Sequence, residues 1–413
     1  MNKLIASASA VGVTTSLLFA PLSSFVHAST PVTITFYESM GSKLGKELQN
    51  LTNQFEKQNP SIQVQLVFTA SYSTLQQKLT ASVAARNEPT IAQLEDSWEQ
   101  KFVDDGIIAP LNQVLPKKSI QDLMPVWVRD NTFNGKLYSI PFNKSDYVLY
   151  YNTDDFKKAG IKTPPSTWAQ LESDAIKLTK SGVSGFGMQP NYYTFEMFLR
   201  QAGGTDLKTK NRQAAFTNQA GLRALSFMTK LAHQDKAASV ISANAYLSDG
   251  FNANEYAMDI DTVAALTYIN NPNTHFALAP IPRGVKAAVP TAGTNVALFT
   301  SATPQQKAAA AKYLEFLIAP NTAFAWSTAT GYLPVDKSIL KSNIWKAYSK
   351  KHPLVGVGPS ELPNAFYGPR VANMFSGETE ASTQIANAVN GTVSVSQGLS
   401  QAAQAINQAL ASN

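Results

Sequence analysis

The sequence predicts an α/β protein of two lobes, and two observations support this. Segments with the two-residue alternation of a half-buried strand are followed by segments with helical spacing, which is typical of a largely parallel sheet with crossover helices. An export segment at the start would leave about 385 of the 413 residues, which is more than one hydrophobic core usually supports. Because no Gly/Ser linker separates the halves, we expect several short crossings between the lobes.

The export segment is predicted at residues 1–28. Lys3 precedes an apolar run of residues 4–20, and Val26-His27-Ala28 resembles a cleavage site. A membrane anchor is the alternative, but polar residues and Pro21 interrupt a run already short for the ~20 residues that span a bilayer. We therefore expect cleavage after Ala28 and a soluble protein in the periplasm or outside the cell.

The composition narrows the class of protein. The chain contains no cysteine, which excludes disulfides, thiolate metal sites and a lipidated cysteine anchor. The net charge of +6 is spread in pairs such as Lys117-Lys118 and Lys157-Lys158. This charge fits either attraction to an anionic solute or an ordinary soluble surface. Because no arginine-rich arm occurs, no nucleic-acid partner is expected.

The elements expected in the first lobe begin with two strand–helix pairs. The pairs are marked by alternation at Val32, Ile34 and Phe36, helical spacing at Leu44, Leu48, Leu51 and Phe55, a second strand over Ile62 to Phe68, and a second helix through Leu75, Leu79 and Val83. Ser39 or Ser42 can cap the first helix, and Asn59-Pro60 ends it. A third strand over residues 90–94 and a helix from about Ser97 follow.

The later elements indicate where the chain crosses between lobes. Asn134-Gly135 predicts a hairpin turn into a strand at residues 137–141, the first crossing, and residues 148–152 form a new strand. Pro164 to Thr167 caps the next helix. A helix-rich stretch runs to about residue 290, a strand is expected at 295–300 and a helix at 305–317, and the final helix has Leu399, Ala403, Ile406 and Leu410 on one face.

Motifs for catalysis are scarce. Beyond residue 28 only His233, His275 and His352 occur, far apart and outside metal-ligand spacing, so we expect neither a metal site nor a cofactor. The sequence contains no dinucleotide fingerprint, phosphate loop or nucleophile elbow. We therefore expect no enzyme; the remote alternative is a secreted glycosidase that uses two carboxylates, with Asp96 and Glu38 as candidates.

Four phrases in fixed order resemble a known family. They are FYESMGSKLGKELQNLTNQFEKQNPSIQV from Phe36, NGKLYSIPFN, VLYYNTDDFKKAGIKTPPSTWAQL and AAKYLEFLIAPNTAFAWSTATGYLPV. Together they resemble family 1 of the extracellular solute-binding proteins of ABC importers, which have the type II periplasmic-binding-protein fold. The first phrase is similar to the branch that collects glycerol-3-phosphate and glycerophosphodiesters.

The resemblance implies two hinge-linked α/β lobes that close on a small polar solute in the interlobe cleft. It implies an N-terminal lobe of residues 29–142 and 291–334 and a C-terminal lobe of residues 143–290 and 335–413. The implied partners are the transmembrane permease subunits of an ABC importer. The protein itself is expected to be a monomer.

The resemblance also implies ligand-binding positions, carried over residue by residue. They are Tyr37, Glu38, Ser39, Tyr72, Asp96, Ser145, Tyr192, Gly293, Asn295, Tyr332 and Arg370. Asp96 is expected to accept hydrogen bonds from glycerol hydroxyls, and Arg370 to hold a phosphate by two parallel hydrogen bonds. Each position has a structural alternative: the tyrosines as packing residues, Asp96 as a helix cap, and Arg370 as the partner of a surface carboxylate.

Departures from the family pattern leave the solute open. Glu38 replaces a histidine, Asn295 replaces a serine, and Asp146 adds an acid beside Ser145. Desolvated carboxylates repel a phosphate but accept hydrogen bonds from the hydroxyls of a sugar. The sequence therefore predicts glycerol-3-phosphate or a glycerophosphodiester first, with a neutral sugar or oligosaccharide as the alternative.

Overall fold

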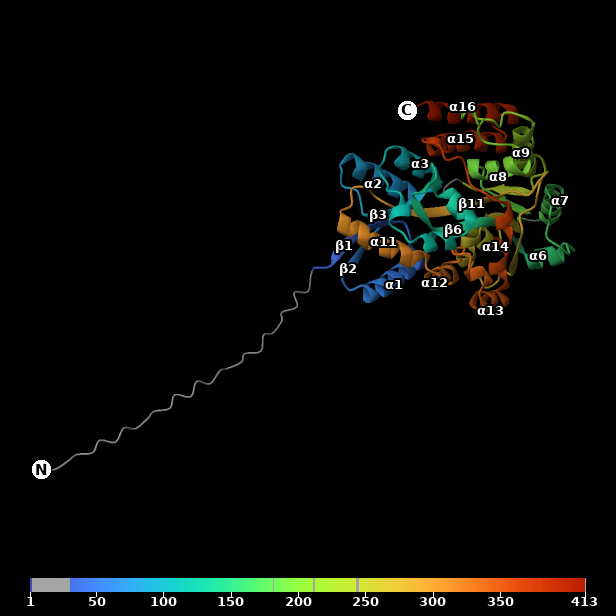
Figure 1. The fold of residues 1–413 in the computed structure, drawn as a ribbon. Helices are drawn as coiled ribbons and strands as arrows, with labels where there is room; N and C mark the ends of the chain where they lie inside the picture. Colours follow the sequence, from blue (N-terminus) through green and yellow to red (C-terminus); the bar gives the residue numbers. More distant parts are fainter. Residues whose placement is uncertain (2–29, 181, 211, 243–244, 413) are drawn as a thin grey trace.

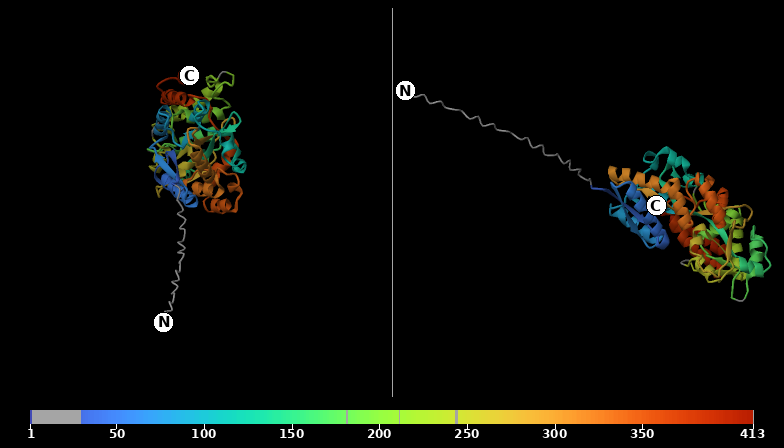
Figure 2. Two further views of the ribbon diagram at one scale, coloured as in Figure 1. Left: turned by 60° about the vertical axis from the view of Figure 1, so that its left-hand side comes forward. Right: turned by 90° about the horizontal axis from the view of Figure 1, so that it is seen from below.

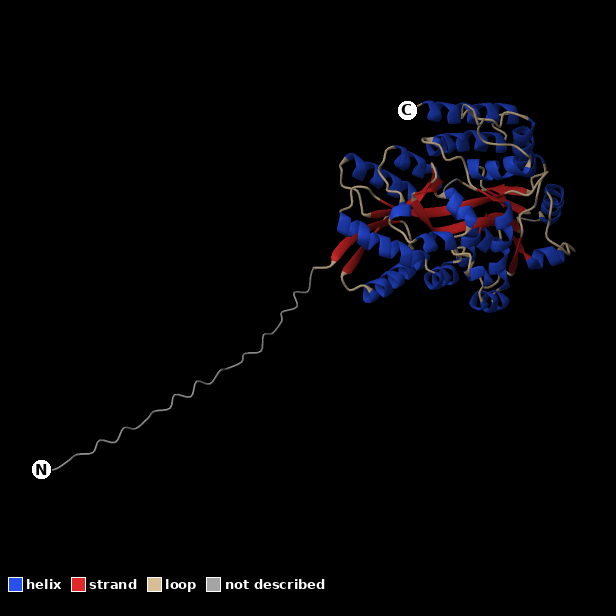
Figure 3. Ribbon diagram, in the orientation of Figure 1, coloured by secondary structure: helices blue, strands red, loops and turns tan. Residues whose placement is uncertain are grey.

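The computed structural model describes Met1 and residues 30–180, 182–210, 212–242 and 245–412. Apart from Met1, the expected signal peptide at 1–28 lies outside the described residues. The remainder folds around a long sheet with helices on both faces (Figure 1 and Figure 3). No helix in the described ranges has both the length and the apolar composition needed to cross a bilayer.

The strands form one ten-stranded sheet and a separate hairpin. The strands are β1 Val32–Glu38, β2 Ile62–Phe68, β3 Ile91–Glu95, β4 Thr132–Phe133, β5 Lys136–Leu137, β6 Ser139–Asn152, β7 Phe186–Met188, β8 Ala238–Val240, β9 Met258–Thr262, β10 Phe276–Ala279, β11 Val289–Leu298 and β12 Ala365–Phe366. The main order is β2-β1-β3-β11-β6-β9-β7-β8, with β10 paired to β6 and β12 to β11, while β4 and β5 form the hairpin. Parallel pairs occur at both ends, but the centre is antiparallel.

The helices connect these strands and cover them. They are α1 Ser42–Gln58, α2 Tyr72–Ala84, α3 Asp96–Asp104, α4 Lys117–Asp122, α5 Pro125–Asp130, α6 Thr153–Lys158, α7 Trp168–Leu178, α8 Tyr192–Gln201, α9 Gln219–Thr229, α10 Leu247–Asn252, α11 Pro304–Ile318, α12 Pro320–Thr330, α13 Asn343–Lys351, α14 Val357–Glu361, α15 Met374–Val389 and α16 Val395–Ala411. Thr167 caps α7 as expected, whereas Gly41, and not Ser39 or Ser42, precedes α1 without a side-chain cap.

Two long strands join the ends of the molecule. The strands expected separately at 137–141 and 148–152 are largely one strand, β6, which pairs with β11 along one edge and with β9 along the other. The expected lobe boundaries after residues 142 and 290 thus fall inside β6 and β11 and stay a prediction. The chain therefore crosses between the lobes within two paired strands, and the sheet is continuous through both.

Buried side chains form three clusters in the described part of the chain, and they differ between the two faces of the sheet. One face carries two separate clusters, one under α2 and α3 and one under α8, α9, α15 and α16. The other face carries a single cluster that runs from α1, α11 and α12 to α10. Figure 2 shows the first strands and the middle of the chain at opposite ends of an elongated molecule. The face with two clusters therefore has a gap in its packed core between them, within the described residues.

Candidate functional site

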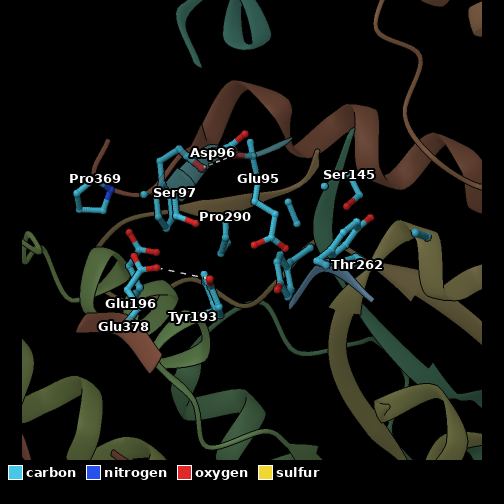
Figure 4. A pocket seen from close by; sticks show the side chains of 18 of the residues that line it. Glu95, Asp96, Ser97, Ser145, Tyr193, Glu196, Thr262, Pro290, Pro369 and Glu378 are labelled. Atoms are coloured by element: carbon cyan, nitrogen blue, oxygen red, sulfur yellow. Dashed lines mark hydrogen bonds between the residues drawn. The ribbon is translucent and has the colours of Figure 1, made fainter. Parts of the chain in front are cut away.

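A cavity of about 300 Å³ lies between the two clusters of the divided face. Its walls are formed by element ends from both lobes, and Figure 4 shows their side chains. The lining residues are Tyr72, Glu95, Asp96, Ser97, Ser145, Tyr147, Tyr193, Glu196, Thr262, Ala264, Pro290, Thr291, Ala292, Gly293, Tyr332, Phe366, Gly368, Pro369 and Glu378. Of the positions expected from the sequence, Tyr72, Asp96, Ser145, Gly293 and Tyr332 are among them.

Tyr72 is held in place by a chain of buried amides. It is the first residue of α2, and its hydroxyl accepts a hydrogen bond of 2.9 Å from Asn143 Nδ2. Gln93 Nε2 in turn donates to Asn143 Oδ1 at 2.9 Å, and Gln93 Oε1 accepts from the Ser39 backbone N–H at 2.7 Å. Ser39 therefore does not line the cavity, but it belongs to the network that orients Tyr72.

Asp96 begins α3 directly after β3 and shares a buried lysine. Lys144 Nζ lies 2.9 Å from Asp96 Oδ1 and 2.9 Å from Asp130 Oδ2, and the Lys144 side chain is fully buried. Burial alone would lower the pKa of Lys144, but the carboxylates of Asp130 and Asp96 raise it above its ordinary value. Lys144 thus stays charged and fixes the position of Asp96.

Asn295 lies behind Asp96 and outside the cavity. Its Nδ2 donates to Asp96 Oδ1 at 2.7 Å and to Glu99 Oε2 at 2.9 Å, while the residue is completely buried. Burial raises the pKa of Glu99 to about 8. The expected contact between Asn295 and the solute is replaced by a positioning contact with Asp96.

Gly293 lies where β11 approaches β6 most closely. Its φ is +99°, and a Cβ there would lie 1.9 Å from the backbone oxygen of Asn143. The register of the two strands shifts between Thr294 and Asn295. Only glycine fits this backbone and this approach, and the resulting bend places the peptide of residue 293 on the wall of the cavity.

The aromatic side chain on α8 that reaches the cavity is Tyr193, and not the expected Tyr192. Tyr192 is completely buried, and its hydroxyl donates to Asp206 Oδ1 at 3.0 Å. Tyr193 is 42% exposed and its hydroxyl lies 3.5 Å from Glu378 Oε2. Helical spacing explains the difference, because Tyr192 shares a face with the buried Phe195 and Leu199.

Carboxyl groups from both lobes face the cavity. Figure 4 shows Glu95 on one side and Glu196 with Glu378 on the other. Burial, and then the neighbouring Asp96, raises the pKa of Glu95 to about 7. Burial, followed by Asp206 and Glu95, raises the pKa of Glu378 to about 8. Burial and Asp206 likewise raise the pKa of Glu196, although Arg200 opposes this. No lysine or arginine is among the described residues that line the cavity.

Tyr37 and Glu38, at the end of β1, lie outside the cavity. Lys78 Nζ is 4.4 Å from the centre of the Tyr37 ring. Glu38 is 3% exposed and accepts a hydrogen bond from the backbone N–H of Met40, and burial raises its pKa. Glu38 thus fixes the turn between β1 and α1, whereas Tyr37 contacts α2.

Arg370 bridges two segments that are distant in sequence. Its Nη1 donates to the carbonyl oxygens of Arg129, Asp130 and Thr132 at 2.9, 2.6 and 2.7 Å. It faces an adjoining cavity of about 550 Å³ that shares Gly368 and Pro369 with the first. In this structure its guanidinium contacts backbone carbonyls, and the expected contact with a phosphate stays a prediction.

The sequence reasoning missed several residues of the site. They are Glu95, Lys144, Tyr147, Tyr193, Glu196 and Glu378. A signal for Glu378 is present, because it interrupts an apolar helical face formed by Met374, Ala381 and Ile385. The described residues contain no group of three histidine or acidic side chains that could hold a metal ion.

Comparison with known proteins places this geometry in a family. The chain is 25% identical over 376 residues to the sn-glycerol-3-phosphate-binding periplasmic protein UgpB of Escherichia coli, covering 85% of each. The structure of UgpB from Mycobacterium tuberculosis in complex with glycerophosphocholine superposes with a TM-score of 0.84 at 22% identity, covering 93% of this chain and 99% of that one. The cyclic alpha-maltosyl-1,6-maltose binding protein of Arthrobacter globiformis gives a TM-score of 0.81 at 22% identity, covering 93% of this chain and all of that one.

These similarities confirm the predicted fold, the two-lobed type II periplasmic-binding-protein fold. The family model for bacterial extracellular solute-binding proteins matches residues 50–353, which is most of the chain. The chain therefore belongs to the bacterial extracellular solute-binding protein family and is a solute-binding protein of the ABC-importer type.

Proposed function

We propose that this protein captures a small, hydroxyl-rich solute of the saccharide class between its lobes and delivers it to the permease of an ABC importer. The observation that supports this choice is the lining of the cavity, where carboxyl groups and tyrosines occur without a lysine or arginine among the described residues. Carboxylates accept hydrogen bonds from hydroxyls, and tyrosine rings cover the apolar faces of a sugar.

A glycerol phosphate ester becomes the second candidate. It is favoured by the similarity to UgpB and by Arg370, which faces the adjoining cavity. In that case the guanidinium would exchange its backbone carbonyls for phosphate oxygens. The carboxyl-lined first cavity would hold only the uncharged part of the ester.

Calorimetric titration separates the two candidates. The purified protein is titrated with glucose- and xylose-type saccharides, glycerol-3-phosphate and glycerophosphocholine. We expect a saccharide to bind stoichiometrically and without turnover, and Asp96→Asn to weaken this binding at least about tenfold. Asp104→Asn, at the exposed end of the same helix, serves as the matched control.

Two results would contradict the saccharide proposal. Saturable binding of phosphate esters alone, abolished by Arg370→Ala, would establish the second candidate. Hydrolysis of a glycoside that is lost in Asp96→Asn would indicate the secreted glycosidase instead.

A further inference from the structure

The acidic side chains of the cavity come from opposite lobes. Glu95 and Asp96 lie at the junction of β3 and α3, whereas Glu196 lies on α8 and Glu378 on α15. Figure 4 shows Glu95 on one side of a common space and Glu196 with Glu378 on the other. A solute held between the lobes therefore meets carboxyl groups on two sides.

The cationic side chains Lys144 and Arg200, beside these carboxyl groups, already form ion pairs with two acidic residues each. Lys144 lies 2.9 Å from both Asp96 and Asp130. Arg200 forms ion pairs with Asp206 and, at 3.7 Å, with Glu196. In the described part of the chain, neither Glu95 nor Glu378 has an ion pair. Two acidic groups thus face each other across the cavity without an ion pair, although the charge of Lys144 lowers the pKa of Glu95 in part.

Glu196 gives an independent indication of a missing donor. The residue is 4% exposed and lines the cavity, yet its Oε1 accepts no hydrogen bond within the described structure. A buried carboxyl oxygen without a donor is costly. Arg200 Nη2 lies 3.7 Å from this same oxygen, which is an ion-pair distance but too long for a hydrogen bond, so a bound solute with a polar hydrogen at this position would supply the hydrogen bond.

When both are ionised, Glu95 and Glu378 repel each other across this site. Glu95 is one of the groups that raise the pKa of Glu378, after burial and Asp206. Excluding water from the closed cleft strengthens such repulsion. A neutral solute leaves this cost unchanged, but a cation between the two carboxylates turns repulsion into attraction toward both lobes.

We propose that the solute carries a protonated amine in addition to hydroxyls, as an amino sugar does, and that its ammonium lies between Glu95 and Glu378. This inference rests on the proposed function, since it specifies the saccharide captured in the same cavity. The tyrosines suit such a solute as well, because an aromatic ring attracts a cation to its face and also covers the apolar face of a sugar. Tyr72, Tyr147, Tyr193 and Tyr332 provide these rings.

The inference predicts a dependence of affinity on pH. Glu378 faces Glu95, Asp206 and, on α8, Tyr193 and Glu196. Glu95 faces Asp96, Lys144, Tyr72, Tyr147 and Tyr193. With pKa values raised to about 7 and about 8, Glu95 and Glu378 hold protons at acidic pH. An ammonium must displace these protons, so affinity rises with pH and protons are released on binding, until the amine of the solute, which titrates like an α-amino group near pH ~7.7–8, loses its own proton.

Three matched disaccharides test the inference. The probes are the β-1,4-linked disaccharide of glucosamine, its N-acetylated counterpart and cellobiose, which share a ring frame and differ in amine, acetamide or hydroxyl. Calorimetry at pH values of about 5 and about 7, where the amine stays protonated, is expected to give the amine at least about tenfold tighter binding than either counterpart at the higher pH. At the lower pH this preference is expected to shrink.

Variants link the preference to the two carboxyl groups. Glu95→Gln and Glu378→Gln keep the side-chain size and are each expected to remove most of the preference for the amine. Glu380→Gln, an exposed position on the same helix as Glu378, is expected to leave it unchanged. Thermal unfolding of each variant checks that the fold is retained.

The outcomes separate this inference from the proposed function. Equal affinity for the three disaccharides, or a preference for the amine that survives in both glutamine variants, overturns the amine inference and leaves saccharide capture intact. Binding of the neutral sugars alone likewise overturns the amine inference and leaves saccharide capture intact. Binding of glycerol phosphate esters alone overturns both.

Discussion

Lys144 positions the side chain of Asp96 on the wall of the cavity. It is fully buried in β6, and its ammonium holds Asp96 at the cavity and Asp130 behind it. The sequence hides this role, because an isolated lysine between Asn143 and Ser145 resembles a surface residue. Only the pairing of β6 with β11 in three dimensions puts that position inside the protein.

Lys144→Met is expected to destabilise the fold by about 3–5 kcal/mol, because it leaves two buried carboxylates without a cation. Urea unfolding measures this loss. The control is Lys101→Met, which breaks an exposed pair with Asp105 and is expected to cost less than about 1 kcal/mol. Adding Asp130→Asn to Lys144→Met should restore part of the stability. Similar losses in both single variants would contradict a specific role for the buried pair.

At the scale of the element, the junction of β6 and β11 depends on one glycine. Gly293→Ala is expected to lower the free energy of unfolding by more than about 2 kcal/mol and to weaken solute binding, because the added Cβ collides with the backbone of Asn143. Gly106→Ala is the control, since its φ is also positive, at +67°, but nothing lies within 4 Å of the new Cβ. An equal loss in both variants would attribute the effect to backbone strain alone.

Local periodicity predicted the elements at the start of the chain and several near its end. The two-residue alternation located β1 and β2, and helical spacing located α1, α2, α11 and α16 to within a few residues. The unbroken length of β6 was missed because its centre, residues 143–146, is polar yet buried between neighbouring strands. Alternation of apolar and polar residues identifies a strand with one buried face. A strand that is buried on both faces does not show this alternation.

The candidate site was less accessible from the sequence than the fold. Asp96, Ser145 and Gly293 lie where the resemblance put them, at the cavity. Glu196 and Glu378 were not found, because their proximity arises from the packing of α8 against α15. Arg370 was expected to reach a ligand, but three backbone carbonyls lie within its reach. These contacts are set by the tertiary structure, and local sequence patterns do not record them.

At the scale of the whole molecule, buried acids make stability depend on pH. Burial raises the pKa of Asp130 to about 7 and the pKa values of Glu99, Asp146 and Glu378 to about 8. Unfolded carboxyl groups titrate near pH ~4. Between these values the folded protein binds more protons than the unfolded chain, so its free energy of unfolding falls as pH rises.

We therefore expect the protein without solute to be most stable near pH ~5 and to lose stability toward pH ~8. Guanidinium unfolding over this range measures the slope. Asp146→Asn is expected to flatten it by about 1–3 kcal/mol across the range, because both oxygens of this completely buried carboxyl group accept no hydrogen bond. Asp104→Asn, at an exposed position, should leave the slope unchanged. Stability that is constant or rises over the range would contradict the expectation.

The continuous cluster beneath the sheet has a consequence for how such a protein can acquire new solutes. The side chains that line the cavity come from element ends on the divided face, while β6, β11 and the cluster on the opposite face run continuously beneath it. Substitutions at Tyr193, Glu196 or Glu378 are therefore expected to change which solute is bound without altering β6, β11 or the cluster on the opposite face. A sensor for another molecule can therefore be designed by changing the residues that line the cavity, while β6, β11 and the cluster on the opposite face are left as they are.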